Sequence, residues 1–331
     1  MMQPTVSVLI VNYNSGDRLG RCLVHLERQS FAEFEIIVVD NGSTDGSERA
    51  AENAGRETGL IRAGENLGFA AANNLAVRSA SGEWLAFLNP DAYPAADWLE
   101  AFSNAVESYP GVDAFGSTQL MADDPSIIDG AGDAYHVFGV PYRGHYGWPT
   151  ETLPEDGECF APCAAAAFYR RRTFESLGGF DESFFCYGED VDLGFRLRLA
   201  GGRAVQLSRA QVLHEGSAIS GRHSDFTLYH GHRNRIWTYF LNMPLTILIP
   251  TAPFHLFANL YLLGRFMAVG GASAYLRALK DGYGGLPRLY ARRRRRQHAR
   301  KASLGAIARM LTWSPLKPYR READLFPIDP Q

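Results

Sequence analysis

The 331-residue sequence has little cysteine, and its cysteines follow none of the spacings that usually bind zinc. The four are Cys22, Cys159, Cys163 and Cys186. The first sixteen residues, MMQPTVSVLIVNYNSG, show no basic segment, long apolar stretch or cleavage site of the kind that directs secretion. Cys159 and Cys163 are close enough in sequence to pair, but we expect reduced thiols in a cytoplasmic protein, because disulfides are rare in that compartment.

Three familiar glycine-rich or phosphate-binding loops are missing as well. A dinucleotide-binding protein carries G-x-G-x-x-G after its first strand, but this sequence has YNSGDRLG there, at residues 13–20. It contains no P-loop, and it lacks the glycine-rich loop that a sugar-1-phosphate nucleotidyltransferase would show after that strand. These absences argue against all three classes of enzyme.

Charge is unevenly distributed along the chain. Residues 236–331 contain 15 Lys and Arg against 4 Asp and Glu, a net charge of +11, whereas residues 1–235 carry −14. Hydrophobic residues make up 46% and charged residues 21%, enough for a sizeable core. We therefore expect two parts with different roles, a domain over 1–235 and a helical, basic and apolar extension over 236–331, and no nucleic-acid partner.

Apolar runs alternate with helical patterns in the first part. Buried strands are predicted at 6–11, 35–40 and 83–88, with weaker ones at 60–62, 164–169, 204–207 and 211–214. Helices are predicted at 17–29, from about 45 with Ser43 or Thr44 as the cap, at 70–79 and at 190–200. This alternation predicts an α/β fold with a mostly parallel sheet. Residues 117–158 show no regular pattern, and we expect a long functional loop there.

The extension begins with an almost uncharged stretch, Pro244 to Gly264, close to the length that spans a bilayer. Pro250 and Pro253 interrupt it, so we expect two short helices on a membrane surface instead of one span. The basic run 292–296 that follows is suited to anionic lipid headgroups.

Three predicted strands end in polar residues: Asn12-Tyr13-Asn14, Asp40-Asn41-Gly42 and Asn89-Pro90-Asp91. The carboxyl ends of parallel strands meet at one edge of a sheet, where ligands usually bind. The sequence therefore predicts one convergent polar site.

The residues around this site carry a family resemblance. The segments VSVLIVNYNSG, VVDNGSTDGS, ENLGFAAANN, FLNPDAYP, GGFDESFFCYGEDVDLGFRLRLAGG and VLHEGSA occur in order over roughly residues 5–225. Together they resemble glycosyltransferase family 2, and its rhamnosyltransferase-like branch in particular. The resemblance implies the GT-A fold and an inverting sugar transfer from a nucleotide diphosphate sugar.

Several residues match positions of that family that bind the donor. Tyr13 matches an aromatic residue that packs on the nucleotide base, and Asp40 and Asn41 match a pair that recognises it, with Asn41 in place of a second Asp. Asn66 and Gly68 match the loop over the ribose and diphosphate, and Asn89 opens the reduced metal motif Asn-Pro-Asp. We expect a dTDP- or UDP-linked donor.

Two further residues match a metal site. Asp91 corresponds to the last carboxylate of the family's metal motif, and His214 resembles a histidine that completes the site in some relatives. Oxygen ligands of this kind suit Mg²⁺ or Mn²⁺, which would neutralise the leaving diphosphate. The alternative for His214 is a purely structural role.

Asp190 matches the general base of the family, which must remove a proton from the acceptor hydroxyl. It opens the helix predicted at 190–200, where the helix dipole favours an anion, so a simple cap is the alternative. Asp192 is expected to pair with Arg196 four residues on. Weaker matches on the acceptor side are Asp181, Glu182, Glu189 and Arg233.

We thus expect a metal-dependent glycosyltransferase of cell-surface polysaccharide synthesis, peripheral to the inner face of the cell membrane. Its first candidate sugar is rhamnose, and its acceptor is a glycan or a polyprenyl-diphosphate-linked glycan. The alternative is a non-catalytic sugar-nucleotide or glycan-binding module of a polysaccharide assembly complex. The sequence does not indicate an oligomeric state.

Overall fold

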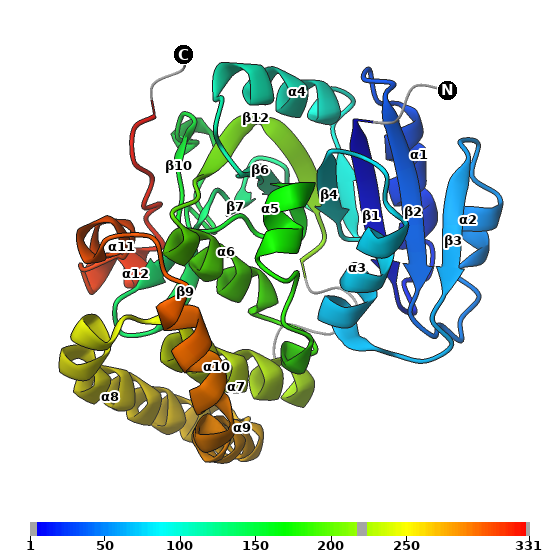
Figure 1. Cartoon of the computed structure of the whole chain (residues 1–331). Coiled ribbons are helices and arrows are strands. Elements are labelled where there is room, and N and C mark those ends of the chain that lie inside the picture. Colours follow the sequence, from blue (N-terminus) through cyan, green and yellow to red (C-terminus); the bar gives the residue numbers. More distant parts are fainter. Residues whose placement is uncertain (1–4, 217–223, 329–331) are drawn as a thin grey trace.

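The computed structural model describes residues 5–216 and 224–328. The strands of its central sheet are β1 (Val6–Asn12), β2 (Phe34–Asp40), β3 (Thr58–Arg62), β4 (Trp84–Leu88), β5 (Ala92–Pro94), β6 (Ala114–Met121), β7 (Ile128–Gly130), β10 (Gly157–Glu158), β11 (Ala166–Arg170) and β12 (Ala204–His214). Their order is β10-β12-β6-β11-β4-β1-β2-β3, with β5 beside β12 and β7 beside β6 (Figure 1). A separate hairpin is formed by β8 (Asp133–His136) and β9 (Val140–Arg143).

Helices cover both faces of the sheet. Those of the first part are α1 (Arg18–Glu27), α2 (Arg49–Glu52), α3 (Gly68–Ser79), α4 (Trp98–Ser108), α5 (Arg171–Ser176) and α6 (Glu189–Ala200), with 3-10 turns η1 (Thr150–Thr152) and η2 (Glu182–Phe184). Alternate side chains of β1 point to opposite faces: Val8 packs with α1 and α4, and Leu9 packs with α3 and α6. Every residue of β1 is buried, as its continuous apolar run predicts.

The N-terminal half of the sheet is parallel, since β1 pairs with β2 and β4, and β2 with β3. The other half is mixed, because β11 runs antiparallel to both β4 and β6. The expected α/β architecture is confirmed. The two short strands predicted at 204–207 and 211–214 are one strand, β12, whose register shifts between Leu207 and Gln211.

The prediction of a long loop over 117–158 is wrong. The segment supplies most of β6, which pairs with β11 and β12 inside the sheet, and also β7, β8, β9 and β10. Its pattern is obscured because β6 buries polar side chains. Ser117 accepts a hydrogen bond from Trp98 Nε1 at 2.8 Å, and Thr118 donates to the carbonyl of Leu207 at 2.9 Å. Buried polar groups need such partners, and sequence periodicity does not reveal them.

Helix α2 begins at Arg49, four residues later than its predicted start near residue 45. The expected cap is used elsewhere, since Ser43 Oγ accepts hydrogen bonds from Asn12 Nδ2 and the Asn14 amide. The side chain of Ser43 thus holds the loop after β1.

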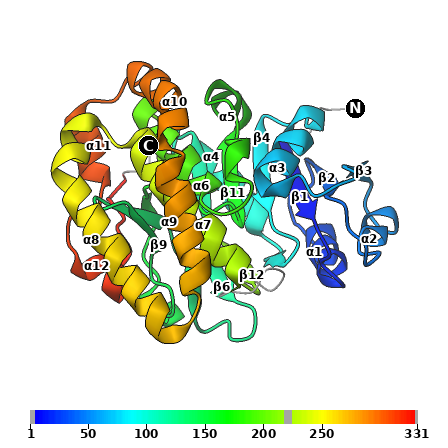
Figure 2. The ribbon, with the colours of Figure 1, turned by 90° about the horizontal axis from the view of Figure 1, so that it is seen from below.

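The C-terminal helices are α7 (Asp225–Asn242), α8 (Leu245–Val269), α9 (Ala272–Gly284), α10 (Leu286–His298), α11 (Leu304–Met310) and α12 (Leu316–Arg320). Seen from below, α8, α9 and α10 lie beside α7 on one side of the molecule (Figure 2). The proposed division at residue 235 falls inside α7. Residues of α6, α7, α8 and α11 share one apolar cluster with Tyr135 of β8, so the extension packs directly on the first part.

The expectation of two short helices over 244–264 is also wrong, because α8 is one helix of 25 residues that contains both prolines. Pro250 and Pro253 are exposed, while Thr251, His255 and Asn259 are buried on the opposite side. Thr251 Oγ1 donates to the carbonyl of Ile247 at 2.7 Å. Packing of the buried side compensates for the backbone hydrogen bonds that the prolines remove.

Candidate active site

The carboxyl ends of β1 and β2 form one polar cluster. Asn12 and Asp40 are partners in the strand register, and Asn12 Nδ2 donates to Asp40 Oδ1 at 3.0 Å and to Ser47 Oγ at 2.9 Å. The amide of Ser43 donates to Asp40 Oδ2 at 3.3 Å. Tyr13 follows directly and is 37% exposed, which leaves its ring accessible. The predicted convergence of these strand ends is present.

Asn41 holds the loop that precedes α3. Its Nδ2 donates to Asn66 Oδ1 at 3.0 Å, and its Oδ1 accepts from the amide of Leu67 at 2.9 Å. Asn66 Oδ1 also accepts from the amide of Gly68 at 3.0 Å. Both the nitrogen and the oxygen of the Asn41 side chain therefore hold this loop. An aspartate here could still accept the bond from Leu67 but could not donate to Asn66, which explains why an amide suits this position.

A buried chain is formed by Asp91 in the turn after β4, His214 at the end of β12 and Asp129 within β7. His214 Nδ1 lies 2.7 Å from Asp129 Oδ2, and His214 Nε2 lies 3.6 Å from Asp91 Oδ1. Burial opposes protonation of His214, but the two carboxylates outweigh it and raise the pKa of the ring. Likewise burial opposes ionisation of Asp91, and His214 outweighs it and lowers the pKa of that carboxyl.

This chain fits a divalent cation. His214 Nε2 is buried and has no hydrogen-bond partner among the described residues. It faces the carboxylate of Asp91, which is only 4% exposed. A histidine that binds a metal usually donates its other N–H to a carboxylate, and Asp129 occupies that position. Nitrogen and oxygen donors of this kind suit Mn²⁺ and tolerate Mg²⁺.

Asp190 lies at the start of α6 beside the end of β4. Its Oδ2 accepts a hydrogen bond from the amide of Ala164 at 3.1 Å, and its Oδ1 accepts from the amide of Val191 at 2.8 Å. The amide of Asn89 donates to the neighbouring Ala165 carbonyl at 2.9 Å. The segment before β11 thus connects Asp190 to the Asn-Pro-Asp strand end. The helix N-terminus stabilises the carboxylate, which suits a base.

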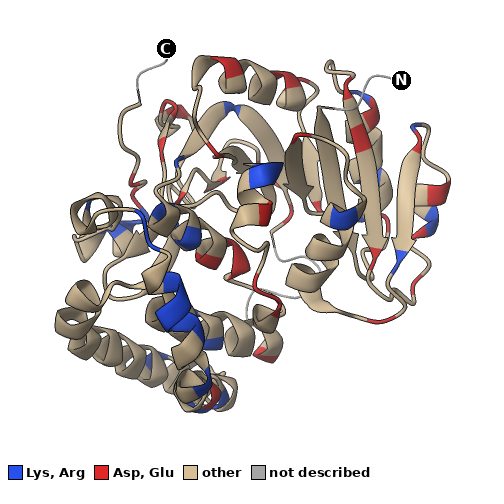
Figure 3. Cartoon of the chain, viewed as in Figure 1, with Lys and Arg blue, Asp and Glu red and all other residues tan. Residues whose placement is uncertain are grey.

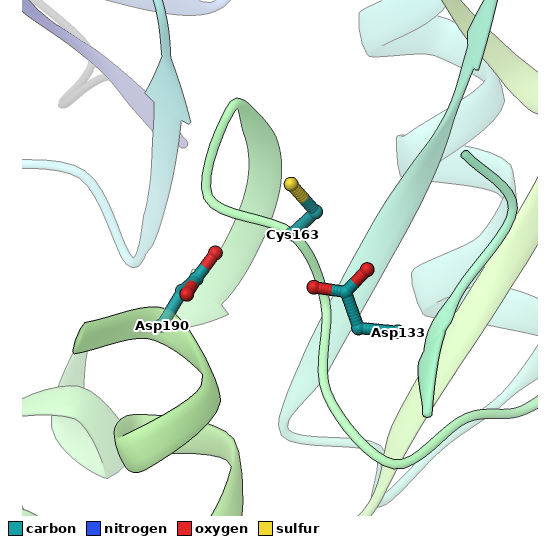
Figure 4. Close-up of side chains that lie close together, drawn as sticks. All are labelled: Asp133, Cys163 and Asp190. Atoms are coloured by element: carbon teal, nitrogen blue, oxygen red, sulfur yellow. The ribbon is translucent and has the colours of Figure 1, made fainter. Parts of the chain in front are cut away.

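Asp133 and Cys163 lie next to Asp190, and the three side chains gather in one space (Figure 4). One ligand atom from each lies within 4.8 Å of the others. Burial, and then the charge of Asp190, raise the pKa of Asp133 to about 8, although Arg143 opposes this. Burial raises the pKa of Cys163 to about 12, so it remains a thiol. A second carboxyl group therefore adjoins the candidate base.

Sequence reasoning missed Asp129, Asp133 and Arg143. All three come from the segment over 117–158, and Arg143 Nη1 lies 2.6 Å from Asp129 Oδ2. The available signal was the pair of carboxylates in Asp129-Gly-Ala-Gly-Asp133, in a stretch expected to be functional. Their partners are distant in sequence, and only the fold brings them together.

Asp192 points away from this space, as expected for a structural residue. It pairs with Arg196 at 2.8 Å and with Arg296 at 2.5 Å. Burial opposes its ionisation, but the two arginines and a hydrogen bond from Asn242 outweigh it and lower its pKa to about 2. The predicted ion pair between Asp192 and Arg196 is confirmed, and Arg296 of α10 also pairs with Asp192.

Asp181 and Glu182 are not brought to the cluster around Asp190. Asp181 pairs with Arg292 at 2.6 Å and Arg296 at 2.7 Å. Glu182 accepts a hydrogen bond from Asn74 Nδ2 at 3.0 Å. These carboxylates therefore join α10 and α3 to η2.

The arginine run of α10 is likewise only partly available to lipids. Arg292 and Arg296 are bound by Asp181, and Arg293 donates to the carbonyl of Met243 at 2.9 Å. The run 292–296, which the sequence suggests is suited to headgroups, therefore offers only part of its charge to a surface. Only Arg294 and Arg295 are exposed.

The loop before α6 has an unusual backbone that α7 holds in place. Phe185, Tyr187 and Gly188 all have positive φ, at 66°, 71° and 81°. Asn234 Nδ2 donates to the carbonyls of Phe184, Cys186 and Tyr187 at 2.9, 2.9 and 2.6 Å. Non-glycine residues with positive φ are strained and need such support.

Arg233 serves the same loop, because its Nη2 donates to the Phe184 carbonyl at 2.9 Å. Glu189 is 5% exposed, and Oε2 has no hydrogen-bond partner among the described residues. Burial and the adjacent Asp190 raise the pKa of Glu189 well above its ordinary value. Neither side chain extends freely toward an acceptor.

Comparisons with known proteins agree with this geometry. The model of the family described as Glycosyl transferase family 2 matches residues 7–178. The chain is 31% identical over 246 residues to the N-acetylglucosaminyl-diphospho-decaprenol L-rhamnosyltransferase of Mycobacterium tuberculosis, covering 67% of this chain and 79% of that one. It is also 31% identical to the O-antigen biosynthesis protein RfbC of Myxococcus xanthus, covering 65% of this chain and 18% of that one.

Solved structures share the fold at low sequence identity. S. aureus TarS 1-349 superposes with a TM-score of 0.56 at 18% identity, covering 92% of this chain and 90% of that one. GalNAc-T7 with UDP, GalNAc and Mn²⁺ gives a TM-score of 0.59 at 17% identity, covering 72% of this chain and 48% of that one. With the family match, the strand-end cluster and the GT-A architecture, the chain belongs to glycosyltransferase family 2.

Proposed function

We propose that the protein is an inverting glycosyltransferase that uses a divalent cation and works at the inner face of the cell membrane. It moves a sugar, with rhamnose as the first candidate, from a nucleotide diphosphate donor to a lipid-linked glycan during cell-surface polysaccharide synthesis. The observation that carries this proposal is the hydrogen bond from the Ala164 amide to Asp190, which places a carboxylate beside the Asn89-Pro90-Asp91 strand end.

The donor is assigned to the ends of β1 and β2 and the loop before α3. The exposed ring of Tyr13 would stack on the base, and Asp40 would accept a hydrogen bond from it. Asn41 shapes the loop that carries Asn66 and Gly68 over the ribose and diphosphate. These features suit a pyrimidine nucleotide, and dTDP-rhamnose is favoured over a UDP-sugar by the similarity to a rhamnosyltransferase.

Asp91 and His214 would hold the cation, with Asp129 fixing the orientation of the imidazole. When bound, the ion neutralises charge that develops on the leaving nucleotide diphosphate. The mannosyltransferase PcManGT of Pyrobaculum calidifontis, solved with GDP-Man and Mn²⁺, has the same fold at 21% identity and a TM-score of 0.52. Mn²⁺ is therefore the first cation to test.

Asp190 would act as the general base. The acceptor hydroxyl oxygen attacks C1 of the sugar as the bond from C1 to the diphosphate oxygen breaks, and the hydroxyl proton passes to the Asp190 carboxylate. Attack from the face opposite the leaving group inverts C1. The amide of Ala164 keeps the carboxylate in place for this transfer.

The acceptor is assigned by similarity to the mycobacterial relative, whose name specifies N-acetylglucosaminyl-diphospho-decaprenol. We propose a sugar on a polyprenyl diphosphate as the acceptor class. Asp133 adjoins Asp190 and supplies a second carboxyl group for a neighbouring acceptor hydroxyl.

The test is release of nucleotide diphosphate from dTDP-rhamnose in the presence of a polyprenyl-diphosphate N-acetylglucosamine and Mn²⁺. Asp190→Asn should lower kcat by about 10²–10⁴-fold, the range for loss of a general base. Asp97→Asn is the matched control, because Asp97 is exposed at the start of α4 and has no side-chain capping bond. A normal rate for Asp190→Asn would overturn the mechanism. Nucleotide binding without turnover under any donor would favour the non-catalytic binding module.

A further inference from the structure

Helix α8 is turned with its polar side inward and its apolar side outward. The buried residues of α8 recur every four positions, at Ile247, Thr251, His255 and Asn259, and three of them are polar. The large hydrophobic side chains of α8 that are at least 50% exposed are Leu245, Ile249, Phe254, Leu256, Phe257, Leu260, Tyr261, Met267 and Val269. A surface helix of a protein surrounded by water shows the opposite arrangement.

Polar contacts fix α8 in this orientation. His255 Nδ1 lies 2.7 Å from the Phe138 carbonyl, and its ring stacks on Tyr239 with the centroids 4.1 Å apart. Asn259 Nδ2 donates to Tyr283 Oη at 3.0 Å, and Arg235 donates to Asn259 Oδ1. These partners come from α7, α9 and the β8–β9 turn. The helix cannot rotate without leaving buried polar groups unpaired.

The same contacts argue against a membrane span. By length and composition α8 is able to cross a bilayer. One side of it, however, packs on the charged Arg235 of α7 and on a loop of the first part of the chain. A span would carry these groups into the hydrocarbon, where unpaired polar backbone and charged side chains are unfavourable.

Basic side chains flank the apolar row. Residues 243–300 contain ten Lys and Arg and one acidic residue, Asp281. The exposed ones without an ion pair among the described residues include Arg265, Lys280, Arg288, Arg294 and Arg295. Figure 3 shows the basic residues of α9 and α10 on the lower part of the molecule, beside α8. A row of Leu and Phe next to Lys and Arg matches an anionic lipid surface.

We propose that α8 lies in the plane of an anionic bilayer, with its outward Leu, Ile and Phe side chains in the interface and the exposed bases of α9 and α10 on the headgroups. In Figure 1 the arrows of β1, β2 and β3 point toward the lower side of the molecule, on which α8 and α9 also lie. This inference rests on the proposed function, in which the acceptor is linked to a lipid. It adds the protein surface that would bring the active site to that acceptor.

The experiment measures binding of the full chain to vesicles of phosphatidylcholine with or without phosphatidylglycerol, in the absence of donor and acceptor. Wild-type protein should float with the anionic vesicles. Ile249→Ser/Phe257→Ser/Leu260→Ser should lower the binding at least about tenfold, since each removes apolar area from the interface. Val24→Ser is the control, because Val24 is an exposed apolar residue of α1.

Charge is tested separately. Arg294→Gln/Arg295→Gln should weaken binding by about fivefold per residue and reduce its salt dependence, as expected for about 1 kcal/mol per base near an anionic surface. Arg78→Gln/Arg172→Gln, exposed on α3 and α5, should bind as wild type does.

Four outcomes would overturn the proposal. Three are wild-type protein that does not bind anionic vesicles, a triple variant that binds like wild type, and a chain that resists extraction at alkaline pH as a spanning protein does. The fourth is a dimer in solution that dissociates in the triple variant, which would assign the face to a second copy. The vesicle assay contains no donor or acceptor, so its result does not depend on whether the proposed transfer reaction occurs. Turnover is measured in a separate assay with a short water-soluble acceptor.

Discussion

His214 Nδ1 lies 2.7 Å from Asp129 Oδ2, a contact between residues 85 positions apart in the sequence. It decides which nitrogen of the ring is available, because the hydrogen on Nδ1 is held by the carboxylate and Nε2 is left facing Asp91. The histidine is therefore oriented before any ligand arrives.

Asp129→Asn should weaken the affinity for Mn²⁺ by about 10–100-fold, the usual effect of losing a carboxylate behind a metal-binding histidine. The measurement is the Mn²⁺ concentration that gives half-maximal turnover. Asp123→Asn, an exposed neighbour, is the control. An unchanged requirement for Mn²⁺ in Asp129→Asn would remove Asp129 from the metal site.

Asp133 should make the stability of the protein depend on pH. Its pKa is about 8 in the folded state, because of burial and then Asp190, and about 4 in the unfolded chain. Between these values the folded protein holds a proton that the unfolded chain has lost. The free energy of unfolding therefore falls as pH rises from about 4 to about 8, by up to about 1.4 kcal/mol per pH unit from this group.

Asp133→Asn removes the titrating group and keeps its shape. Urea unfolding of wild type and variant at about pH 5 and about pH 8 should show the variant gaining stability relative to wild type at the higher pH. A stability difference that is the same at both pH values would contradict the assignment. Asp123→Asn again serves as the control, since Asp123 is exposed.

Asn234→Ala should lower kcat by on the order of 10–100-fold, because small displacements of a base are costly to the rate. The substitution removes the donor that holds three carbonyls of the strained loop before Asp190. Asn234→Asp keeps the shape but loses the donor, and it should be equally impaired. Turnover is measured well below the unfolding midpoint, so that loss of stability is separated from loss of rate. Asn104→Ala, exposed on α4, is the control, and a normal kcat in Asn234→Ala would refute the positioning role.

Much of the fold was readable from the sequence, and the reasons differ between elements. The buried strands β1, β2 and β4 are continuous apolar runs, and Asp40, Asn89 and Asp91 stand at or just after the carboxyl ends of β2 and β4, at one edge of the sheet. β6 was hidden because its buried polar side chains are satisfied by partners far away in sequence, such as Trp98 for Ser117. Long-range hydrogen bonds of this kind leave no periodic signal.

The C-terminal helix α8 illustrates a second limit. Pro250 and Pro253 predict an interruption from local chemistry, but tertiary packing of His255 and Asn259 overrides it. Because of this packing, the polar side chains of α8 face the protein and its large apolar side chains face outward, the reverse of the usual arrangement. The sequence contained the polar residues, but it did not show that they face inward.

The final prediction concerns Gly68, which couples the donor loop to the loop before the base. A Cβ added at Gly68 would lie 2.5 Å from the Phe185 ring, and the amide of Ala70 donates to the Phe185 carbonyl at 3.2 Å. Gly64 has nearly the same φ, 81° against 82°, yet an added Cβ there meets nothing within 4 Å. The two glycines separate backbone strain from the contact with Phe185.

Gly68→Ala should therefore raise the donor KM and lower kcat together, whereas Gly64→Ala should show only a stability loss of about 1 kcal/mol. Phe185→Ala in the Gly68→Ala background removes the ring contacts of the new methyl group but leaves the Phe185 carbonyl oxygen 2.6 Å from it, so it should recover only part of the donor binding. The donor KM and kcat of these three variants are obtained from initial rates over a range of donor concentrations. Equal effects of the two glycine substitutions would show that backbone strain alone is responsible, and that the contact between Gly68 and Phe185 has no role in catalysis.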